Sequence, residues 1–194
     1  KERIDFLEKC EVNRSTIGKH NRKIRNSIII YVAFLIFTGI TGYYLNFSTG
    51  GDRLKSYLYE RSILNQLHDS PEDPNLYGAL GLIYYSQKRY PEAIKAYEKS
   101  LQLMPDQDQV LNNLSWLYAT CQNPAYRNPQ KALLLAKKAA ALNPSPEILD
   151  TLAESYFVNG DIKKAVQIEL KILAKSDNRK YYEAQLRRFT EALE

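Results

Sequence analysis

The sequence predicts an all-α protein: an N-terminal transmembrane helix followed by an α-solenoid of three helix-turn-helix repeats with flanking helices. Residues 27–47 contain no charged residue, and beyond them apolar and small residues recur at helical spacing in three segments separated by prolines. The expected parts are a basic tail at 1–26, the transmembrane helix at 27–47, a linker helix at 52–70, the repeats at 71–177 and a capping helix at 178–194.

The first repeat runs from Pro74 to Pro105, with a turn expected at Lys88–Pro91. Because helix axes approach to about 8–10 Å only where the side chains between them are short, Gly81 is expected to lie opposite Ala93. The residues expected to interlock are Leu80, Gly81 and Tyr84 on the first helix and Ala93, Tyr97 and Leu101 on the second.

The pattern recurs twice. The second copy has Leu114, Ser115, Tyr118, Ala132, Ala136 and Ala139, and the third has Leu152, Ala153, Tyr156, Gly160 and Ala165. The interval from Tyr118 to Ala132 is fourteen residues, against nine for the equivalent interval in the other two copies. This five-residue excess predicts a surface loop within Cys121–Gln130, where two Asn-Pro steps disfavour a continuing helix.

The uncharged segment is long enough, as a helix, to cross a hydrocarbon core of about 30 Å. A cleaved signal peptide is the alternative, but the basic segment before it is long and no Ala-x-Ala site follows. Six basic residues lie within the twenty residues before the helix and three within the twenty after it, so the positive-inside rule places the N-terminus in the cytoplasm. The predicted localisation is a single-pass inner membrane protein that contacts the bilayer through residues 27–47, with the repeats in the periplasm or otherwise outside.

Residues that would carry catalysis are sparse. His20 and His68 are the only histidines and fall on opposite sides of the predicted membrane, so we expect no enzyme, no catalytic residue, no metal and no cofactor. Asp150 and Glu154 lie one helical turn apart, but without a third ligand type they are more simply a solvated acidic face. The net charge of +5 does not indicate a nucleic-acid partner, because the basic cluster adjoins the membrane helix.

The repeated spacing resembles the tetratricopeptide repeat (TPR), on Leu80-Gly81, Tyr84 and Ala93 and their later equivalents. The resemblance implies that the first helix of each repeat lines a groove that holds another protein. Matched onto this chain, the groove residues are Asn75, Leu82, Tyr85, Gln109, Asn112, Trp116, Glu147, Asp150, Glu154 and Phe157, with Gly78, Ser86, Ala119, Thr120 and Val158 at the remaining positions.

These residues predict an aromatic strip with an acidic end. Asp150 and Glu154 would steer a basic segment toward the groove, while Trp116 could equally pack between repeats. TPR co-chaperones of heat-shock proteins hold a terminal carboxylate with Lys, Asn and Arg. This chain has Gly78, Leu82 and acidic residues at the matching positions, so that ligand is disfavoured there.

The expected function is a membrane-anchored protein-interaction module, acting as an assembly factor or accessory subunit of a membrane protein complex. Residues 59–105 also resemble the periplasmic TPR part of cytochrome c maturation proteins, which implies capture of apocytochrome segments. A translocon-associated TPR chaperone is a further alternative with the same topology.

Overall fold

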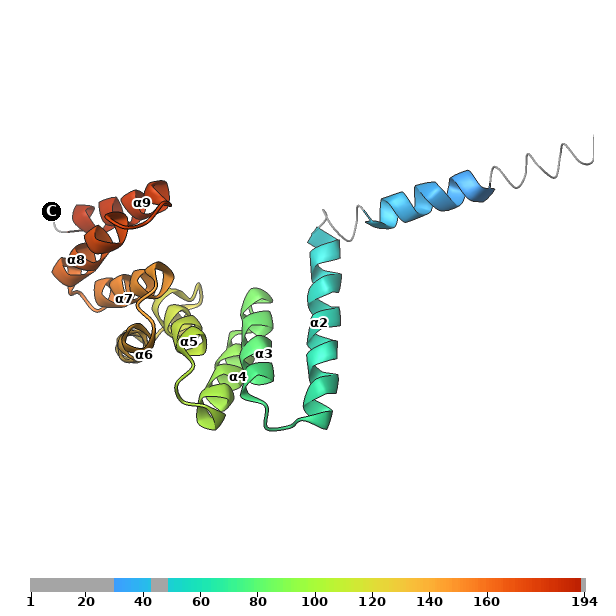
Figure 1. The fold of residues 1–194 in the computed structure, drawn as a ribbon, viewed down its shortest axis with the longest axis horizontal. Coiled ribbons are helices and arrows are strands. Elements are labelled where there is room, and N and C mark those ends of the chain that lie inside the picture. The colour runs from blue at the N-terminus through green and yellow to red at the C-terminus, as the bar shows by residue number, and fades with distance from the viewer. Residues whose placement is uncertain (1–29, 43–48, 193–194) are drawn as a thin grey trace, which may run out of the picture. The chain divides into compact units, whose positions relative to one another are not determined.

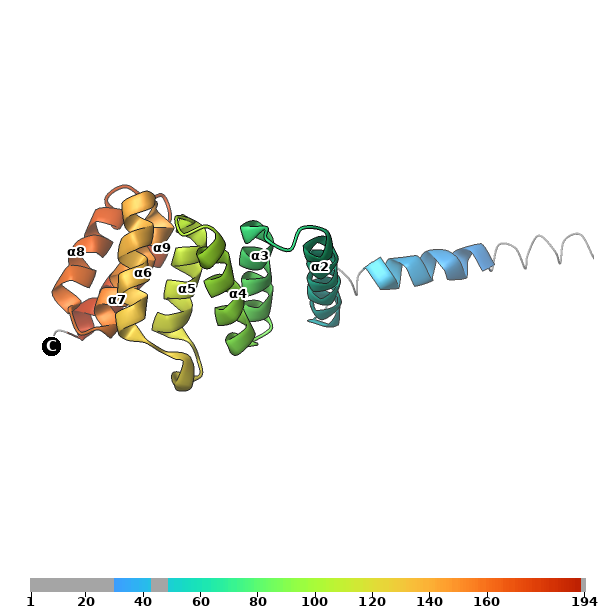
Figure 2. The ribbon, with the colours of Figure 1, turned by 90° about the horizontal axis from the view of Figure 1, so that it is seen from below.

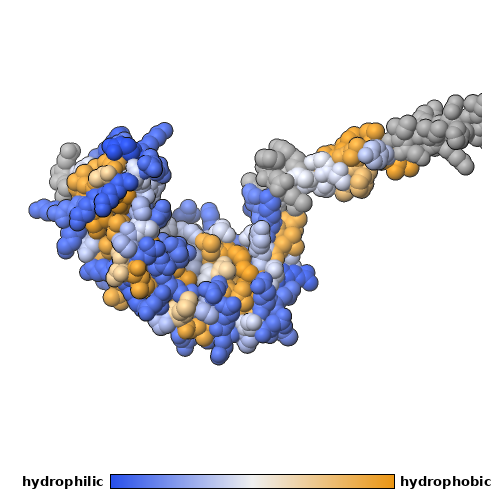
Figure 3. All heavy atoms as spheres, in the orientation of Figure 1, coloured by the Kyte–Doolittle hydropathy of each residue, from blue (hydrophilic) through white to orange (hydrophobic). Residues whose placement is uncertain are grey.

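The computed structural model describes residues 30–42 and 49–192, and the regular structure in these ranges is entirely helical (Figure 1). The chain divides into two compact units between Tyr57 and Leu58. In the first unit, residues 30–42 are helical and strongly apolar on their surface (Figure 3). Helix α2 (Thr49–Asp69) crosses the boundary, and the second unit contains all the later helices.

The predicted membrane localisation is wrong by this structure. In the described residues, no helix is both long enough and apolar enough to cross a membrane. The described part of the apolar helix, residues 30–42, measures only about 20 Å at 1.5 Å per residue. The rest of the span predicted at 27–47, and the basic tail predicted at 1–26, lie outside the described residues.

Three helical hairpins follow one another in the second unit (Figures 1 and 2). They are α3 (Pro74–Ser86) with α4 (Tyr90–Leu103), α5 (Asp108–Thr120) with α6 (Pro129–Leu142), and α7 (Pro146–Val158) with α8 (Ile162–Leu173), and α9 (Arg179–Glu191) packs on α8. The prediction of an all-α repeat of helical hairpins is confirmed.

Prolines and short polar residues set where these helices begin. Pro74 occupies the start of α3, and the Asp73 side chain accepts a hydrogen bond from the Asn75 backbone N–H at 2.8 Å. Asn128 caps α6 in the same way, accepting from the Lys131 N–H at 3.0 Å. A proline at this position gives up no intrahelical hydrogen bond, and the cap satisfies an N–H that would otherwise have no partner.

Gly81 lies against the ring of Tyr97, which follows Ala93 by one helical turn on α4. A Cβ atom at position 81 would lie 2.4 Å from Tyr97 Cδ1, which is inside van der Waals contact. Tyr97 is 1 % exposed. The glycine is therefore required because a large aromatic ring of α4 occupies the space beside α3.

The turns of the first and third hairpins share one backbone conformation. Lys88 has φ of 60° and Gly160 has φ of 82°, both left-handed. After each, the chain is held by backbone hydrogen bonds, from Arg89 N to Tyr84 O and from Asp161 N to Tyr156 O, both 2.9 Å. Glycine adopts this conformation freely, whereas lysine does so at a cost.

The five-residue excess of the second hairpin forms a loop with a short 3-10 helix, η1 (Pro124–Tyr126). Residues 122–125 are exposed, while Cys121 is buried. The loop is tied back by Asn128 N, which donates to Tyr118 O at 2.9 Å, and by Tyr126, which packs against the core. The hairpin therefore resumes in register at α6.

Candidate functional site

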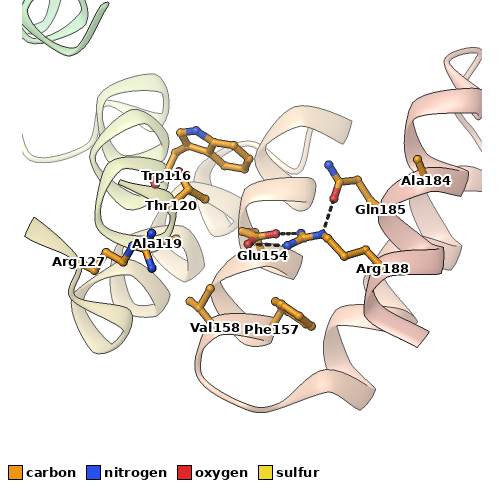
Figure 4. A pocket seen from close by; sticks show the side chains of 10 residues that line it. All are labelled: Trp116, Ala119, Thr120, Arg127, Glu154, Phe157, Val158, Ala184, Gln185 and Arg188. Atoms are coloured by element: carbon orange, nitrogen blue, oxygen red, sulfur yellow. Dashed lines mark hydrogen bonds and ion pairs between the residues drawn. The ribbon is translucent and has the colours of Figure 1, made fainter. Parts of the chain in front are cut away.

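A pocket of about 600 Å³ opens between α5, α7 and α9. Figure 4 shows its walls, with α5 on one side, α7 at the base and α9 opposite. The loop before α6 contributes one residue, Arg127. The lining residues are Trp116, Ala119, Thr120, Arg127, Glu154, Phe157, Val158, Ala184, Gln185 and Arg188.

The apolar part of the pocket comes from successive repeats. Trp116 of α5 and Phe157 of α7 are both half-buried and line the same space. Phe157 is held in place by the fully buried Phe189 of α9, with ring centroids 4.8 Å apart. Two aromatic side chains that are fixed yet accessible can bind an apolar side chain of a partner at little entropic cost. Trp116 therefore lies at the pocket wall rather than inside the core.

The acidic residues of α7 do not form the exposed steering charges expected from the sequence. Asp150 and Glu154 are only 8 % and 5 % exposed. Glu154 accepts two hydrogen bonds from the guanidinium of Arg188, and Asp150 accepts one from the Tyr181 hydroxyl at 2.9 Å. The physical reason is that α9 packs over this end of α7 and covers both carboxylates.

A further carboxylate, Glu169 of α8, is fully buried in the same region, and neither of its oxygens has a hydrogen-bond partner. Burial raises the pKa of Glu169 to about 8, and the negative charge of Asp150 adds to the effect. Burial likewise raises the pKa of Asp150 to about 6, against the hydrogen bond from Tyr181. Burial thus favours the neutral form of both carboxyl groups, more strongly for Glu169 than for Asp150.

A second pocket, of about 490 Å³, lies between α3 and α5. It brings together the predicted residues Asn75, Leu82 and Gln109, and it also contains Asp106 and Asp108. Asp106 is paired with Lys138 at 3.0 Å, and Asp108 accepts a hydrogen bond from Asn143 at 2.6 Å. Six of the predicted site residues thus line two separate pockets, three in each.

Four predicted site residues line neither pocket, and one of them is the buried Asp150 described above. Tyr85 packs against Tyr90, with ring centroids 6.1 Å apart. Asn112 is half-buried, and its Oδ1 atom is buried without a partner. Glu147 is exposed at the start of α7. Tyr85 therefore does not share the pocket that Trp116 and Phe157 line.

The sequence reasoning missed the polar residues that α9 and the inserted loop supply. Arg188 of α9 reaches across to Glu154, and its guanidinium carbon lies 4.9 Å from the Phe157 ring centroid. The sequence did contain one indication that α9 has a polar face toward the repeats: Tyr181, Gln185 and Arg188 are spaced to lie on the same side of the helix. Arg127 carried no such signal, since its position depends on how the loop folds.

Within the described residues no group of His, Cys, Asp or Glu is arranged to hold a metal ion. The pocket instead offers aromatic faces, guanidinium groups and an amide. Such a surface can bind a polypeptide by apolar contact and hydrogen bonding.

Comparison with known proteins identifies the repeat. Residues 74–107 match the tetratricopeptide repeat family model. The first hairpin is thus similar to a tetratricopeptide repeat, and the match covers this part of the chain alone. The auxiliary subunit NAA15 of the N-terminal acetyltransferase A complex of Arabidopsis thaliana is 33% identical over 90 residues, which are 46% of this chain and 10% of that protein. The chain thus matches only about a tenth of the length of this curated relative.

Two solved structures share the fold. TTC0263, a TPR protein of Thermus thermophilus, superposes with a TM-score of 0.56 at 21% identity, covering 73% of this chain and 76% of that one. The first TPR of Spaghetti (RPAP3), solved with the HSP90 peptide SRMEEVD, has a TM-score of 0.55 at 20% identity, covering 62% of this chain and 95% of that one. The hairpins of the second unit therefore have the fold of a TPR solenoid.

Proposed function

We propose that this chain is a protein-interaction module that binds a segment of a partner protein in the pocket between α5, α7 and α9. The observation that carries the proposal is that Trp116 and Phe157, from different repeats, line one accessible pocket of about 600 Å³. A volume of this size accommodates one or two side chains of a bound segment.

The TPR fold favours this function. The similar TPR of Spaghetti (RPAP3) was solved bound to an HSP90 peptide, and the relative from Arabidopsis thaliana is named as an auxiliary subunit of a complex. We extend to this chain the role of an assembly factor or accessory subunit that holds another protein. The two periplasmic chaperone interpretations depended on the membrane location, and the described residues give them no basis.

A random-peptide selection against the 194-residue chain tests the proposal. Trp116 is the only tryptophan in the sequence, so its fluorescence reports binding at the pocket itself. We expect selected peptides to change this emission on titration. Phe157→Ala should weaken them about thirtyfold, since loss of a buried aromatic contact costs about 2 kcal/mol of binding.

The matched control is Lys95→Ala with Lys99→Ala on α4, two residues that do not line the pocket. Circular dichroism establishes that each variant is folded. Peptides that bind folded Phe157→Ala as tightly as the unaltered chain, or that lose binding only with the α4 changes, would show that partners dock elsewhere.

A further inference from the structure

The charge of the pocket comes from two arginines that lie outside the repeated helices. Figure 4 shows the guanidinium groups of Arg127 and Arg188 reaching toward the pocket from opposite sides. Arg127 belongs to the inserted loop, directly after η1, and Arg188 belongs to α9. The charge that a ligand meets is therefore set by the loop and the last helix.

Arg127 has hydrogen-bonding capacity left for a ligand. Its Nε atom donates to the Cys121 carbonyl at 2.6 Å, which fixes the direction of the side chain. A guanidinium carries five N–H groups, so four remain. Within residues 49–192 the structure shows no carboxylate paired with Arg127, and the residue is exposed.

Arg188 also keeps donors in reserve. It donates through Nη1 and Nη2 to Glu154 and through Nε to Gln185. Two N–H groups are left by the same count. Because the Arg188 guanidinium also stacks on Phe157, it is held rigidly at the pocket wall, so little entropy is lost when it binds a further acceptor.

The pocket carries a net positive charge, because Glu154 neutralises Arg188 and the charge of Arg127 is left without a paired carboxylate in the described part of the chain. Glu154 is the only acidic residue among those that line the pocket, and its side chain is 7 % exposed beneath Arg188. Asp150 and Glu169 are buried and are not lining residues. A ligand in the pocket therefore meets two guanidinium groups beside two aromatic rings.

We propose that this pocket selects a protein segment in which a carboxylate lies next to an apolar side chain. Arg127 and Arg188 donate to the carboxylate, and Trp116 and Phe157 contact the apolar group. This inference rests on the proposed function and reverses the basic ligand expected from the sequence. The pocket does not include Gly78 or Leu82, the positions at which the sequence disfavoured binding of a terminal carboxylate.

Three matched peptides test the charge preference. Each is acetylated and amidated, is built on Gly and Ser, and carries a central Phe-Glu-Glu, Phe-Gln-Gln or Phe-Lys-Lys. Titration followed by Trp116 emission should show that the Glu peptide binds at least tenfold more tightly than the Gln peptide, with the Lys peptide weakest. The advantage of the Glu peptide should shrink with added salt. A further Gln peptide with a free C-terminus shows whether a terminal carboxylate replaces the side-chain one.

Arg127→Gln is the decisive variant, because the residue is exposed and its loss leaves no buried charge unpaired. It should weaken the Glu peptide about tenfold, the value of one charge-assisted hydrogen bond, and leave the Gln peptide unchanged. Arg187→Gln, an exposed arginine of α9 that does not line the pocket, should change neither.

Other outcomes separate the two proposals. If the peptides bind equally and Phe157→Ala weakens all of them, the pocket binds protein segments but does not select a carboxylate. Preference for the Lys peptide, or no effect of Arg127→Gln, also overturns the inference alone. If neither these peptides nor any library peptide alters Trp116 emission, the proposed function itself fails.

Discussion

The first and third hairpins share a backbone plan but have different interiors. In the first, Gly81 lies against the buried ring of Tyr97, and its buried side chains are uncharged. In the third, Ala153 takes the place equivalent to Gly81, and the carboxylates of Asp150, Glu154 and Glu169 are buried under α9. The comparison shows that the same helical hairpin can be built around close apolar packing, as in the first repeat, or around buried carboxylates, as in the third.

This difference predicts that the two ends respond differently to the environment. The first hairpin should be sensitive to added volume, because it has no space for another atom beside Tyr97. The third hairpin, with α9, should be sensitive to pH, because its stability depends on the protonation of buried acids.

The largest expected effect is that of pH on stability through Glu169. Its pKa is raised to about 8 when folded, from an ordinary value of 4.5. Between these values the folded chain holds a proton that the unfolded chain has lost, so stability falls as pH rises across this window. The slope is at most about 1.4 kcal/mol per pH unit for one proton. Urea midpoints measured from pH 5 to pH 9 check this.

Glu169→Gln sharpens the test. The amide stays neutral at every pH, so only Asp150 should still make the stability fall with rising pH. This fall should end near pH 6, the raised pKa of Asp150. Above pH 7 the variant should be more stable than the unaltered chain. Identical pH profiles for the two would mean that Glu169 is not the buried acid responsible.

The next effect concerns volume beside Tyr97. Gly81→Ala places a Cβ 2.4 Å from the ring, which forces the helices apart and should cost about 2–3 kcal/mol of unfolding free energy. The equivalent reverse change in the third hairpin, Ala153→Gly, should cost about 1 kcal/mol through helix propensity. Chemical denaturation measures both, and a tolerated Gly81→Ala would contradict the close contact.

The smallest effect belongs to the two left-handed turn residues. Lys88→Gly should stabilise the chain by about 0.5–1 kcal/mol, because glycine adopts φ of 60° without steric cost. Gly160→Ala should destabilise it by a similar amount. Thermal melts resolve shifts of this size. The two substitutions should change the melting temperature in opposite directions. A change in the same direction would show that the two turns do not share one conformation.

Most of the fold could be predicted because it depends on the spacing of residues that lie close together in the sequence. Proline positions, the small residue at the helix crossing and the alanine pattern of the second helices each mark a feature within one hairpin. The partner of Gly81 could not be read this way, because either Ala93 or Tyr97 fits the same helical face, and only the side-chain packing decides between them.

The site was less predictable because its chemistry arises from contacts between elements far apart in the sequence. The positions of Trp116 and Phe157 within the repeats predicted that they share one surface, and both line the pocket between α5, α7 and α9. The state of Glu154 could not, since it depends on Arg188, thirty-four residues later. Because of this contact, Glu154 is part of a buried ion pair instead of an exposed acid, and the guanidinium group of Arg188 lines the pocket.

The origin of Arg127 has a consequence for how such a binding surface can diversify. The residue lies at the end of a loop whose residues 122–125 are exposed, and the helices on either side keep their register. Substitutions or length changes in that loop can alter the charge presented to a partner while the helices remain as they are. A change of ligand preference can therefore arise from substitutions in the inserted loop alone, because such substitutions do not disturb the packing of the helices.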